Sequence, residues 1–191
     1  MKALKERIIA DGIGIGTEIV KVDSFLNHQI DVALLDEVGL EFARRFEGCG
    51  VSKILTVEAS GIAIACMAAR HMGNIPVLFA KKAAPSTMTE EFYGAEVKSF
   101  TKGTTSVVRV SKKYLNRGDR ILILDDFLAH GEAAIGMAEL VEQAGAELVG
   151  VGAVIEKEFQ GGGRRLRERG CRVESLAVIG SIRDGKIYFL D

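Results

Sequence analysis

Two adjacent acids, Asp125 and Asp126, end an apolar run in the segment ILILDDFLAHGEAA, residues 121–134. Side-by-side carboxylates repel each other, so the pair costs stability unless hydroxyl-bearing or positive groups lie beside it. The small residues from Ala129 to Ala133 lead into a helix-like stretch, and helix N-termini present free N–H groups with a partial positive charge. This order predicts that the acids accept hydrogen bonds from two sugar hydroxyls and that the loop binds a phosphate. A strand–helix turn with Asp as the cap is the structural alternative.

Unusual side chains also follow three other short apolar runs, in EASG at 58–61, AKK at 80–82 and EKEF at 156–159. Short buried strands that alternate with helices predict a parallel sheet with helices on both faces. Such sheets bind ligands at the carboxyl ends of their strands, where loops lead into helix N-termini. We therefore expect these three stretches to line one rim together with residues 125–133. For EASG the alternative is a turn in which Ser60 is the N-cap of the next helix.

The hydrophobic pattern predicts the helices and strands that hold this rim. Strands are expected at 18–22, 53–57, 76–80, 121–125 and 147–156. Helices are expected at 2–10, from the N-cap Asp31 to Phe46, at 62–72 and at 132–144. Alternating polar and apolar residues predict an antiparallel pair at 95–101 and 105–111, and Asp184-Gly185 predicts the turn of a C-terminal hairpin.

The bulk properties are those of one ordinary globular domain. The 191 residues are 48% hydrophobic and 27% charged, and the net charge of −1 argues against a dedicated nucleic-acid binder. No apolar run approaches the roughly 20 residues that span a bilayer, and the N-terminus lacks the apolar core of a signal peptide. The three cysteines, Cys49, Cys66 and Cys171, are widely spaced, so we expect reduced thiols in a cytosolic protein.

Three weaker signals have mostly structural explanations. The glycines of GIGIG at 12–16 follow a charged helix rather than a strand, which argues against a dinucleotide-binding loop. GGGRRLRERG at 161–170 predicts a loop and a solvated basic helix, with a phosphate- or partner-binding patch as the alternative. His28, His71 and His130 are too scattered for a metal site, and His71 is expected on a helix surface.

The segment 121–134 closely resembles the signature of type I phosphoribosyltransferases, which bind phosphoribosyl diphosphate (PRPP). The resemblance implies that Asp125 and Asp126 are catalytic residues that hold the ribose 2′- and 3′-hydroxyls. It also implies a 5′-phosphate loop made of Ala129, His130, Gly131, Glu132 and Ala133. The usual Thr or Ser hydroxyls of that loop are absent here, so phosphate binding is expected to depend on backbone N–H groups and on His130. Glu132 is expected to point away from the phosphate, because like charges repel.

Further stretches resemble the xanthine phosphoribosyltransferases and extend the resemblance over essentially the whole chain. They are VDSFLNHQID at 22–31, EASGIA at 58–63, IEKEFQ at 155–160 and RVESLA at 172–177. The resemblance implies that Val20 and Asn27 lie against a purine base. An Asn amide offers both a donor and an acceptor, which suits the mixed edge of a purine. For Asn27 the alternative is a turn residue before the next helix.

Three side chains near the end of the rim are also candidates for contact with the base. Lys157 is suited to donate to a 6-oxo group and would disfavour adenine, whose 6-amino group is itself a donor. Phe127 and Phe159 flank the same rim and would stack on a purine, with plain core packing as the alternative.

The resemblance places pyrophosphate at the EASG turn and at the lysines that follow the next strand. The turn residues so implied are Glu58, Ala59, Ser60 and Gly61, with a non-proline cis peptide among them. Lys81 or Lys82 is expected to contact pyrophosphate, with solvated lysines as the alternative. Residues 83–94 are expected to form a lid that excludes water from PRPP. Mg²⁺ is expected to bridge PRPP oxygens, because this ion keeps mostly water and substrate ligands.

The expected protein is a single phosphoribosyltransferase domain over residues 1–191, with a mostly parallel twisted sheet and helices on both faces. Its core is expected at about 38–155 and a small base-binding hood at about 1–37 and 156–191. The implied reaction converts xanthine and PRPP to xanthosine 5′-monophosphate (XMP) and pyrophosphate. The resemblance implies a cytoplasmic homodimer, and no nucleic-acid or membrane partner is expected. The alternatives are transfer to guanine, hypoxanthine or adenine, or a PRPP-sensing transcription regulator on the same fold.

Overall fold

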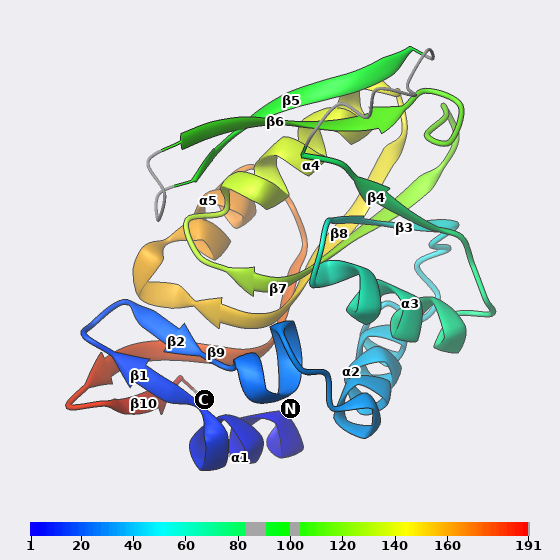
Figure 1. The fold of residues 1–191 in the computed structure, drawn as a ribbon. Helices are drawn as coiled ribbons and strands as arrows, with labels where there is room; N and C mark the ends of the chain where they lie inside the picture. The colour runs from blue at the N-terminus through cyan, green and yellow to red at the C-terminus, as the bar shows by residue number, and fades with distance from the viewer. Residues whose placement is uncertain (83–90, 100–103, 191) are drawn as a thin grey trace.

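A six-stranded sheet forms the centre of the computed structural model, which describes residues 1–82, 91–99 and 104–190 (Figure 1). Its strands, in the order β10-β9-β8-β7-β3-β4, are β10 Lys186–Phe189, β9 Val173–Arg183, β8 Glu147–Lys157, β7 Arg120–Leu128, β3 Lys53–Val57 and β4 Val77–Ala80. Neighbours from β9 to β4 run parallel, and β10 pairs antiparallel with β9 through the predicted C-terminal hairpin. The predicted mostly parallel α/β sheet is therefore confirmed.

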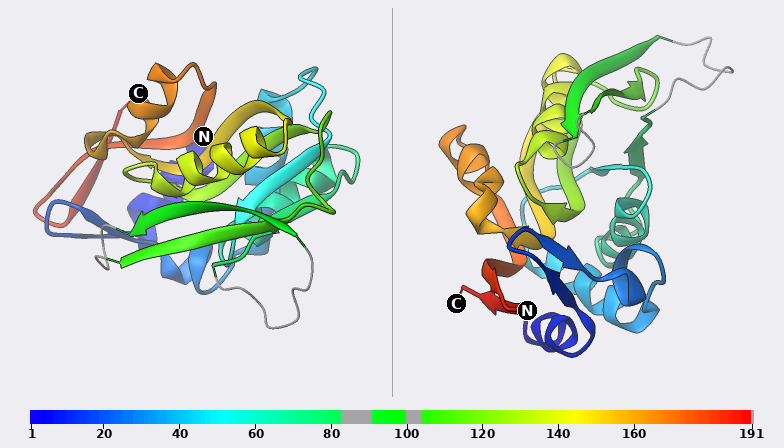
Figure 2. Two further views of the ribbon diagram at one scale, coloured as in Figure 1. Left: turned by 90° about the horizontal axis from the view of Figure 1, so that it is seen from above. Right: turned by 60° about the vertical axis from the view of Figure 1, so that its left-hand side comes forward.

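Helices cover both faces of this sheet. They are α1 Lys2–Asp11, α2 Val32–Arg45, α3 Gly61–His71, α4 Glu132–Gln143 and α5 Gly162–Glu168, with a π-helical turn at Asp23–Asn27 and a 3-10 turn at Glu158–Gln160. Figures 1 and 2 show α2 and α3 on one face and α4 on the other. An antiparallel hairpin, β5 Phe92–Ser99 and β6 Thr104–Ser111, lies over α4, and its pairing is as predicted.

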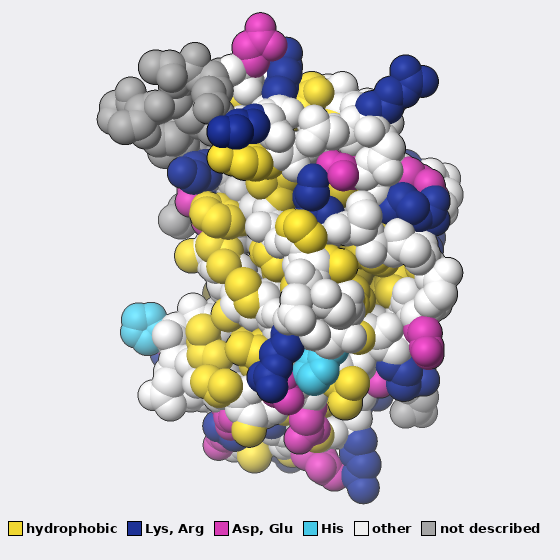
Figure 3. Space-filling model, turned by 90° about the vertical axis from the view of Figure 1, so that its right-hand side faces the viewer, with side chains coloured by type: hydrophobic (Ala, Val, Ile, Leu, Met, Phe, Trp, Pro, Cys, Tyr) yellow, Lys and Arg dark blue, Asp and Glu magenta, His cyan; other side chains and the backbone are white. Residues whose placement is uncertain are grey.

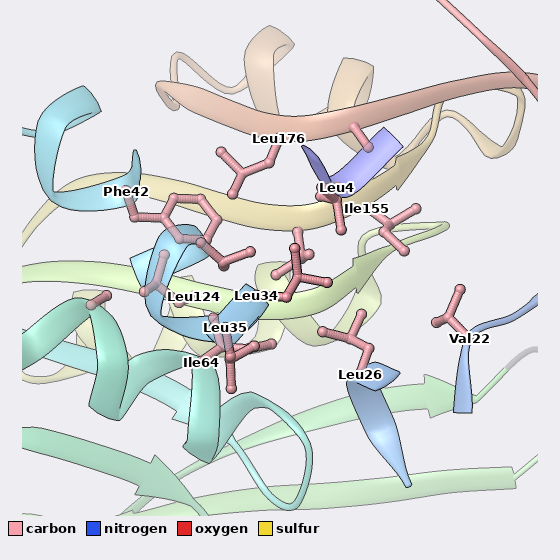
Figure 4. Close-up of a cluster of buried hydrophobic side chains, with 14 of the residues drawn as sticks. Leu4, Val22, Leu26, Leu34, Leu35, Phe42, Ile64, Leu124, Ile155 and Leu176 are labelled. Atoms are coloured by element: carbon pink, nitrogen blue, oxygen red, sulfur yellow. The ribbon is translucent and has the colours of Figure 1, made fainter. Parts of the chain in front are cut away.

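Burial on both faces of the sheet explains the apolar run of β7. Leu122 and Leu124 are fully buried in the core cluster that contains side chains of α2 and α3, part of which Figure 4 shows. Ile121 and Ile123 are fully buried in a second cluster, with side chains of α4 such as Met137. Because successive side chains of a strand point to opposite faces, a strand covered on both sides must be apolar throughout.

The chain connections diverge at one place in the sheet, between β3 and β7. From β3 the chain passes through α3 to β4 on one side, whereas from β7 it passes through α4 to β8 on the other. The pairing of β3 with β7 ends at Leu55 and Ile123, while β7 continues beside β8 as far as Leu128. The neighbouring strands β3 and β7 therefore separate, and α/β sheets bind ligands in the crevice at such a point.

The two ends of the chain lie together beside β9 (Figure 1). A short hairpin, β1 Ile13–Ile15 and β2 Ile19–Lys21, contacts β9 and β10, and α1 contacts the same two strands. The Met1 ammonium donates to the Leu176 carbonyl of β9. The segments predicted to form the hood are thus neighbours, although β9 and β10 also extend the main sheet.

The remaining predicted helices and strands agree closely with the structure, with two exceptions. The strand predicted at 121–125 continues to Leu128, so both acids lie within β7 rather than at its end. The strand β1, within GIGIG, was not predicted. Asp31 caps α2 as predicted, because its carboxylate accepts the Leu34 N–H at 3.1 Å. Within the described ranges, no helix is long and apolar enough to cross a membrane.

Candidate functional site

A cavity of about 800 Å³ opens where β3 and β7 separate. The strand ends of β3, β7 and β8 line it, together with Glu18 of the N-terminal hairpin loop and Ile19, the first residue of β2. The predicted site residues in its lining are Glu58, Ala59, Ser60, Lys82, Asp125, Asp126, Phe127, Ala129, His130, Gly131, Glu132, Ala133 and Lys157. The four stretches expected along one rim thus meet at one cavity.

The adjacent acids have different surroundings. The Asp125 side chain is 8% exposed, and its Oδ1 accepts the Asp126 N–H at 3.0 Å. Burial raises the pKa of Asp125 well above its ordinary value, and the charge of Asp126 adds to that rise. Asp126 is half-buried, and its Oδ2 accepts the Ser60 hydroxyl at 2.8 Å. The hydroxyl-bearing partner expected beside the pair is therefore Ser60.

The EASG turn reaches the acids from the end of β3. The peptide bond between Glu58 and Ala59 is cis, which confirms the predicted non-proline cis peptide. Ser60 is at the N-cap position of α3, as the structural alternative had it, but its side chain makes no cap hydrogen bond and its hydroxyl donates to Asp126 instead. Gly61 is in close contact with Thr56, since a Cβ atom at position 61 would lie 2.0 Å from Thr56 Oγ1. A residue with a side chain would therefore push the turn away from β3.

The two candidate lysines point to different places. Lys82 lines the cavity, and its N–H donates to Glu58 Oε1 at 2.7 Å. Lys81 lines a separate cavity of about 520 Å³ beside β4, and its ammonium lies 5.9 Å from the centre of the Phe79 ring. Of the predicted lid, residues 83–90 lie outside the described residues, and its last residues already belong to strand β5.

The loop before α4 leads into the helix through a glycine in the left-handed backbone conformation. Gly131 precedes the helix with φ of 85°, a conformation that glycine adopts without strain. The carboxylate of Glu132, in the first turn, accepts a hydrogen bond from Arg165 of α5 at 2.6 Å. The loop therefore presents N–H groups beside the acids, and the negative charge of Glu132 is paired.

Asn27 and Lys157 come from opposite ends of the chain. Asn27 ends the π-helical turn, and its amide nitrogen is 3.4 Å from Asp126 Oδ2. Lys157 donates to the Glu18 carbonyl at 3.0 Å, and its ammonium lies 5.8 Å from the centre of the Phe127 ring. Burial lowers the pKa of Lys157 from its ordinary value. Phe127 lines the cavity but also packs against the core.

Of the predicted base contacts, Val20, Asn27 and Phe159 are not part of the cavity lining. Several side chains that do line the cavity were not predicted. The side chains of Val20 and Phe159 pack in or against the core cluster. Their neighbours Ile19 and Gln160 line the cavity instead. Gln160 Oε1 is buried and accepts no hydrogen bond from any residue that the structure describes, so it is a candidate ligand contact. Gln160 could have been predicted as a site residue, because it ends the stretch IEKEFQ that carried the family resemblance.

The segment GGGRRLRERG and His71 both lie in less exposed surroundings than the sequence predicted. GGGRRLRERG does form a short helix, α5, but Gly162 and Gly163 are buried and Arg165 contacts the loop before α4. His71 is half-buried rather than on an open surface, and its Nε2 lies 2.8 Å from Asp36 of α2. Across the described part of the chain, no group of three or more His, Cys, Asp or Glu residues is arranged to hold a metal ion.

Comparison with known proteins gives a family and a fold. Residues 43–180 match the family model described as phosphoribosyl transferase domain. The chain is 55% identical to a protein of Ruminiclostridium cellulolyticum named xanthine phosphoribosyltransferase, over 100% of both chains. It is also 55% identical to the Clostridioides difficile protein of the same name, over 99% of this chain and 100% of the relative.

The solved structures support the same fold at lower sequence identity. Adenine phosphoribosyltransferase from Rhodothermus marinus superposes with a TM-score of 0.71 at 24% identity, covering 93% of this chain and 99% of that one. The enzyme of the same name from Leishmania donovani superposes with a TM-score of 0.73 at 18% identity, covering 92% and 80%. At this identity the likeness is evidence for the fold alone.

The raised pKa of Asp125 predicts that Asp125→Asn stabilises the folded protein at neutral pH. The unfolded carboxyl titrates near 3.8, whereas the folded one keeps its proton to higher pH. Between these pKa values the folded state binds more protons, so the free energy of unfolding falls as pH rises. Asn carries no charge and keeps an oxygen acceptor for the Asp126 N–H. The gain should grow as the pH rises above the unfolded value towards neutral pH.

Urea unfolding of both proteins across this pH range measures the effect. Asp11→Asn, at an exposed acid of α1 that pairs with Arg7, is the control and should give no such gain. An Asp125→Asn protein less stable than the parent at the upper end of the range would show that burial does not destabilise the carboxylate.

Proposed function

Because the chain belongs to the phosphoribosyltransferase family, we propose that it transfers the phosphoribosyl group of PRPP to xanthine, giving XMP and pyrophosphate. One observation supports this most strongly: Asp125, Asp126, Ser60 and the loop 129–133 meet at one cavity where β3 and β7 separate. Relatives of the same length that are 55% identical carry the name xanthine phosphoribosyltransferase, which favours xanthine among the purines.

The acid pair would act on the ribose. Substitution at the anomeric carbon builds positive charge on the sugar, and carboxylates fixed beneath it favour that transition state. The ribose 2′- and 3′-hydroxyls would donate to Asp125 and Asp126. Hydrogen bonds to the charged form lower a carboxyl pKa, so substrate binding would offset the burial that raises the pKa of Asp125.

The base would lie between Asn27 and Lys157. The Asn27 amide nitrogen faces Asp126, which leaves its carbonyl oxygen to accept from a purine N–H. Lys157 is held by the Glu18 carbonyl and has a lowered pKa, and it would donate to the 6-oxo group. Xanthine has a second carbonyl, at position 2, which needs a further donor, and the Gln160 amide lines the same cavity.

Pyrophosphate would leave at the other end of the cavity. Lys82 lines it there, beside the turn that contains the cis bond of Glu58. We favour Lys82 over Lys81 for contact with pyrophosphate, because Lys81 lines the cavity beside β4. The oxygen donors nearest the proposed ribose, Asp125 and Asp126, suit Mg²⁺, which would neutralise the departing pyrophosphate when bound with PRPP.

We also propose a cytoplasmic homodimer. Figure 3 shows hydrophobic side chains gathered in a band on the side of the molecule that carries α3 and β4. Phe79 of β4 is 37% exposed, and Pro76, Val77 and Leu78 line the adjoining cavity. Exposed apolar surface of this kind is typical of protein interfaces. Sedimentation would measure the assembly directly, and a monomer at micromolar concentration would contradict it.

A competition assay with Mg²⁺ and PRPP tests the proposed reaction. Xanthine, guanine, hypoxanthine and adenine are supplied together, and the nucleotide products are separated and quantified. We expect XMP to dominate. Dominance of another nucleotide would keep the reaction type and change the base. Absence of any product, with retarded DNA in a gel-shift experiment, would favour a PRPP-sensing regulator.

The acid pair predicts that Asp125→Asn together with Asp126→Asn abolishes turnover while the protein stays folded. Removal of both charges should lower kcat/KM by at least about 100-fold, as for other preorganised charges at a transition state. Steady-state kinetics and thermal unfolding of the same preparation measure both effects. Asp11→Asn is the matched control. Near-normal activity in the double variant would show that the pair has no catalytic role.

The position of Asn27 predicts a change in base binding when it is replaced. Asn27→Ala should raise KM for xanthine about tenfold, because a buried purine edge loses a hydrogen-bond partner. KM for PRPP should change less than about twofold, since the 3.4 Å contact with Asp126 is long. Gln29→Ala, at an exposed residue of the same segment, is the control. Equal increases in both constants would argue against a base-reading role.

A further inference from the structure

The start of α5 packs directly on the loop before α4. The Gly162 N–H donates to the Ala129 carbonyl at 2.9 Å. A Cβ atom on Gly162 would lie 2.4 Å from that carbonyl oxygen and 2.6 Å from the Gly131 nitrogen. Contacts of this length with backbone atoms exclude any side chain, so the run of glycines at 161–163 allows the helix to touch the loop backbone.

Arg165, one turn further along α5, makes two contacts with the same loop. Its Nη1 atom donates to the His130 carbonyl at 2.6 Å and to Glu132 Oε1 at 2.6 Å. The side chain of Glu132 is 21% exposed and that of Arg165 is 43% exposed, so the pair lies at the rim rather than in the core. One guanidinium thus bridges the backbone and the acid of the loop.

These contacts set the direction of the loop N–H groups. In a trans peptide the carbonyl of one residue and the N–H of the next point in opposite directions. The Ala129 and His130 carbonyls both point to α5, where Gly162 and Arg165 donate to them. The N–H groups of His130 and Gly131 must therefore point away from α5, and the loop that carries them lines the cavity.

Arg165 also offsets a charge conflict at this helix N-terminus. The free N–H groups of the first turn of α4 favour one negative charge, and Glu132 already supplies one. A phosphate at the same place would be repelled by an unpaired carboxylate. Pairing Glu132 with Arg165 at 2.6 Å cancels that charge and turns the carboxylate to α5.

We propose that Arg165 is a positioning residue for the 5′-phosphate of PRPP and of the product nucleotide. It does so by orienting the loop 129–133 through the His130 carbonyl and by neutralising Glu132. This inference rests on the proposed function, because it takes the loop as the phosphate site.

The test compares one ligand that carries the 5′-phosphate with one that does not. KM for PRPP and the inhibition constant of XMP should each rise about tenfold in Arg165→Ala, the usual worth of a charge-assisted hydrogen bond. The inhibition constant of pyrophosphate, which has no 5′-phosphate, should stay within about twofold, and so should kcat. A general loss of structure would weaken both ligands together. Arg164→Ala, which removes the exposed pair with Glu158 on the same helix, is the matched control and should change none of these values.

Two further variants separate the role in orientation from the role in charge. Glu132→Gln in the Arg165→Ala background should recover at least about half of the lost affinity on a logarithmic scale, because the repelling carboxylate is gone. Arg165→Lys should recover the charge but not both contacts, so its constants should fall between those of the parent protein and those of Arg165→Ala. Unchanged XMP inhibition in Arg165→Ala, or equal loss for XMP and pyrophosphate, would overturn the inference. Failure of the parent protein to use PRPP or bind XMP would instead overturn the proposed function.

Discussion

The early separation of β3 and β7 is the constraint on which the rest of the site depends. Their pairing ends at Leu55 and Ile123, so the residues that follow on both strands face a crevice rather than each other. Across it, Ser60 Oγ donates to Asp126 Oδ2 at 2.8 Å, which joins the turn after β3 to the acids of β7. Because α4 begins shortly after β7, a helix N-terminus reaches the same crevice. Sheet topology therefore brings the hydroxyl, the acids and the loop together before any ligand binds.

Asp125 shows what this arrangement costs. The side chain is buried beside a second carboxylate, and both effects disfavour its charged form. A core position of β7 filled by an apolar residue would be more stable, as Ile123 and Leu124 illustrate on the two faces of the same strand. A ligand that donates hydrogen bonds to this carboxylate would stabilise its charged form, which the free protein does not do. The free energy that the protein loses by burying the carboxylate would then contribute to ligand affinity.

The sequence predicted features that depend on neighbouring residues, on a repeating pattern or on the general rule for strand ends, and it missed individual contacts between residues far apart in the chain. Asp31 was predicted as a cap because its carboxylate reaches the N–H only three residues ahead. The partners Ser60 and Asp126 are 66 residues apart, so no local pattern indicated their hydrogen bond. In the three-residue strand β2, the alternation of faces puts Val20 in the core and Ile19 at the cavity, and so short a strand gives too little pattern to decide this.

The segment that forms α5 resembled an ordinary solvated helix, because the partners of Arg165 and Arg167 lie in other elements of the fold. Composition alone predicts that its arginines lie in water, and their partners become visible only when β8 and the loop before α4 are folded. Arg167 then holds the buried Glu156 through two contacts of 3.1 Å, one residue before Lys157, while Arg165 holds the loop. Both ends of the proposed nucleotide site are thus fastened to one seven-residue helix. The base end and the phosphate end of the proposed site are therefore connected through one helix and not only through separate loops.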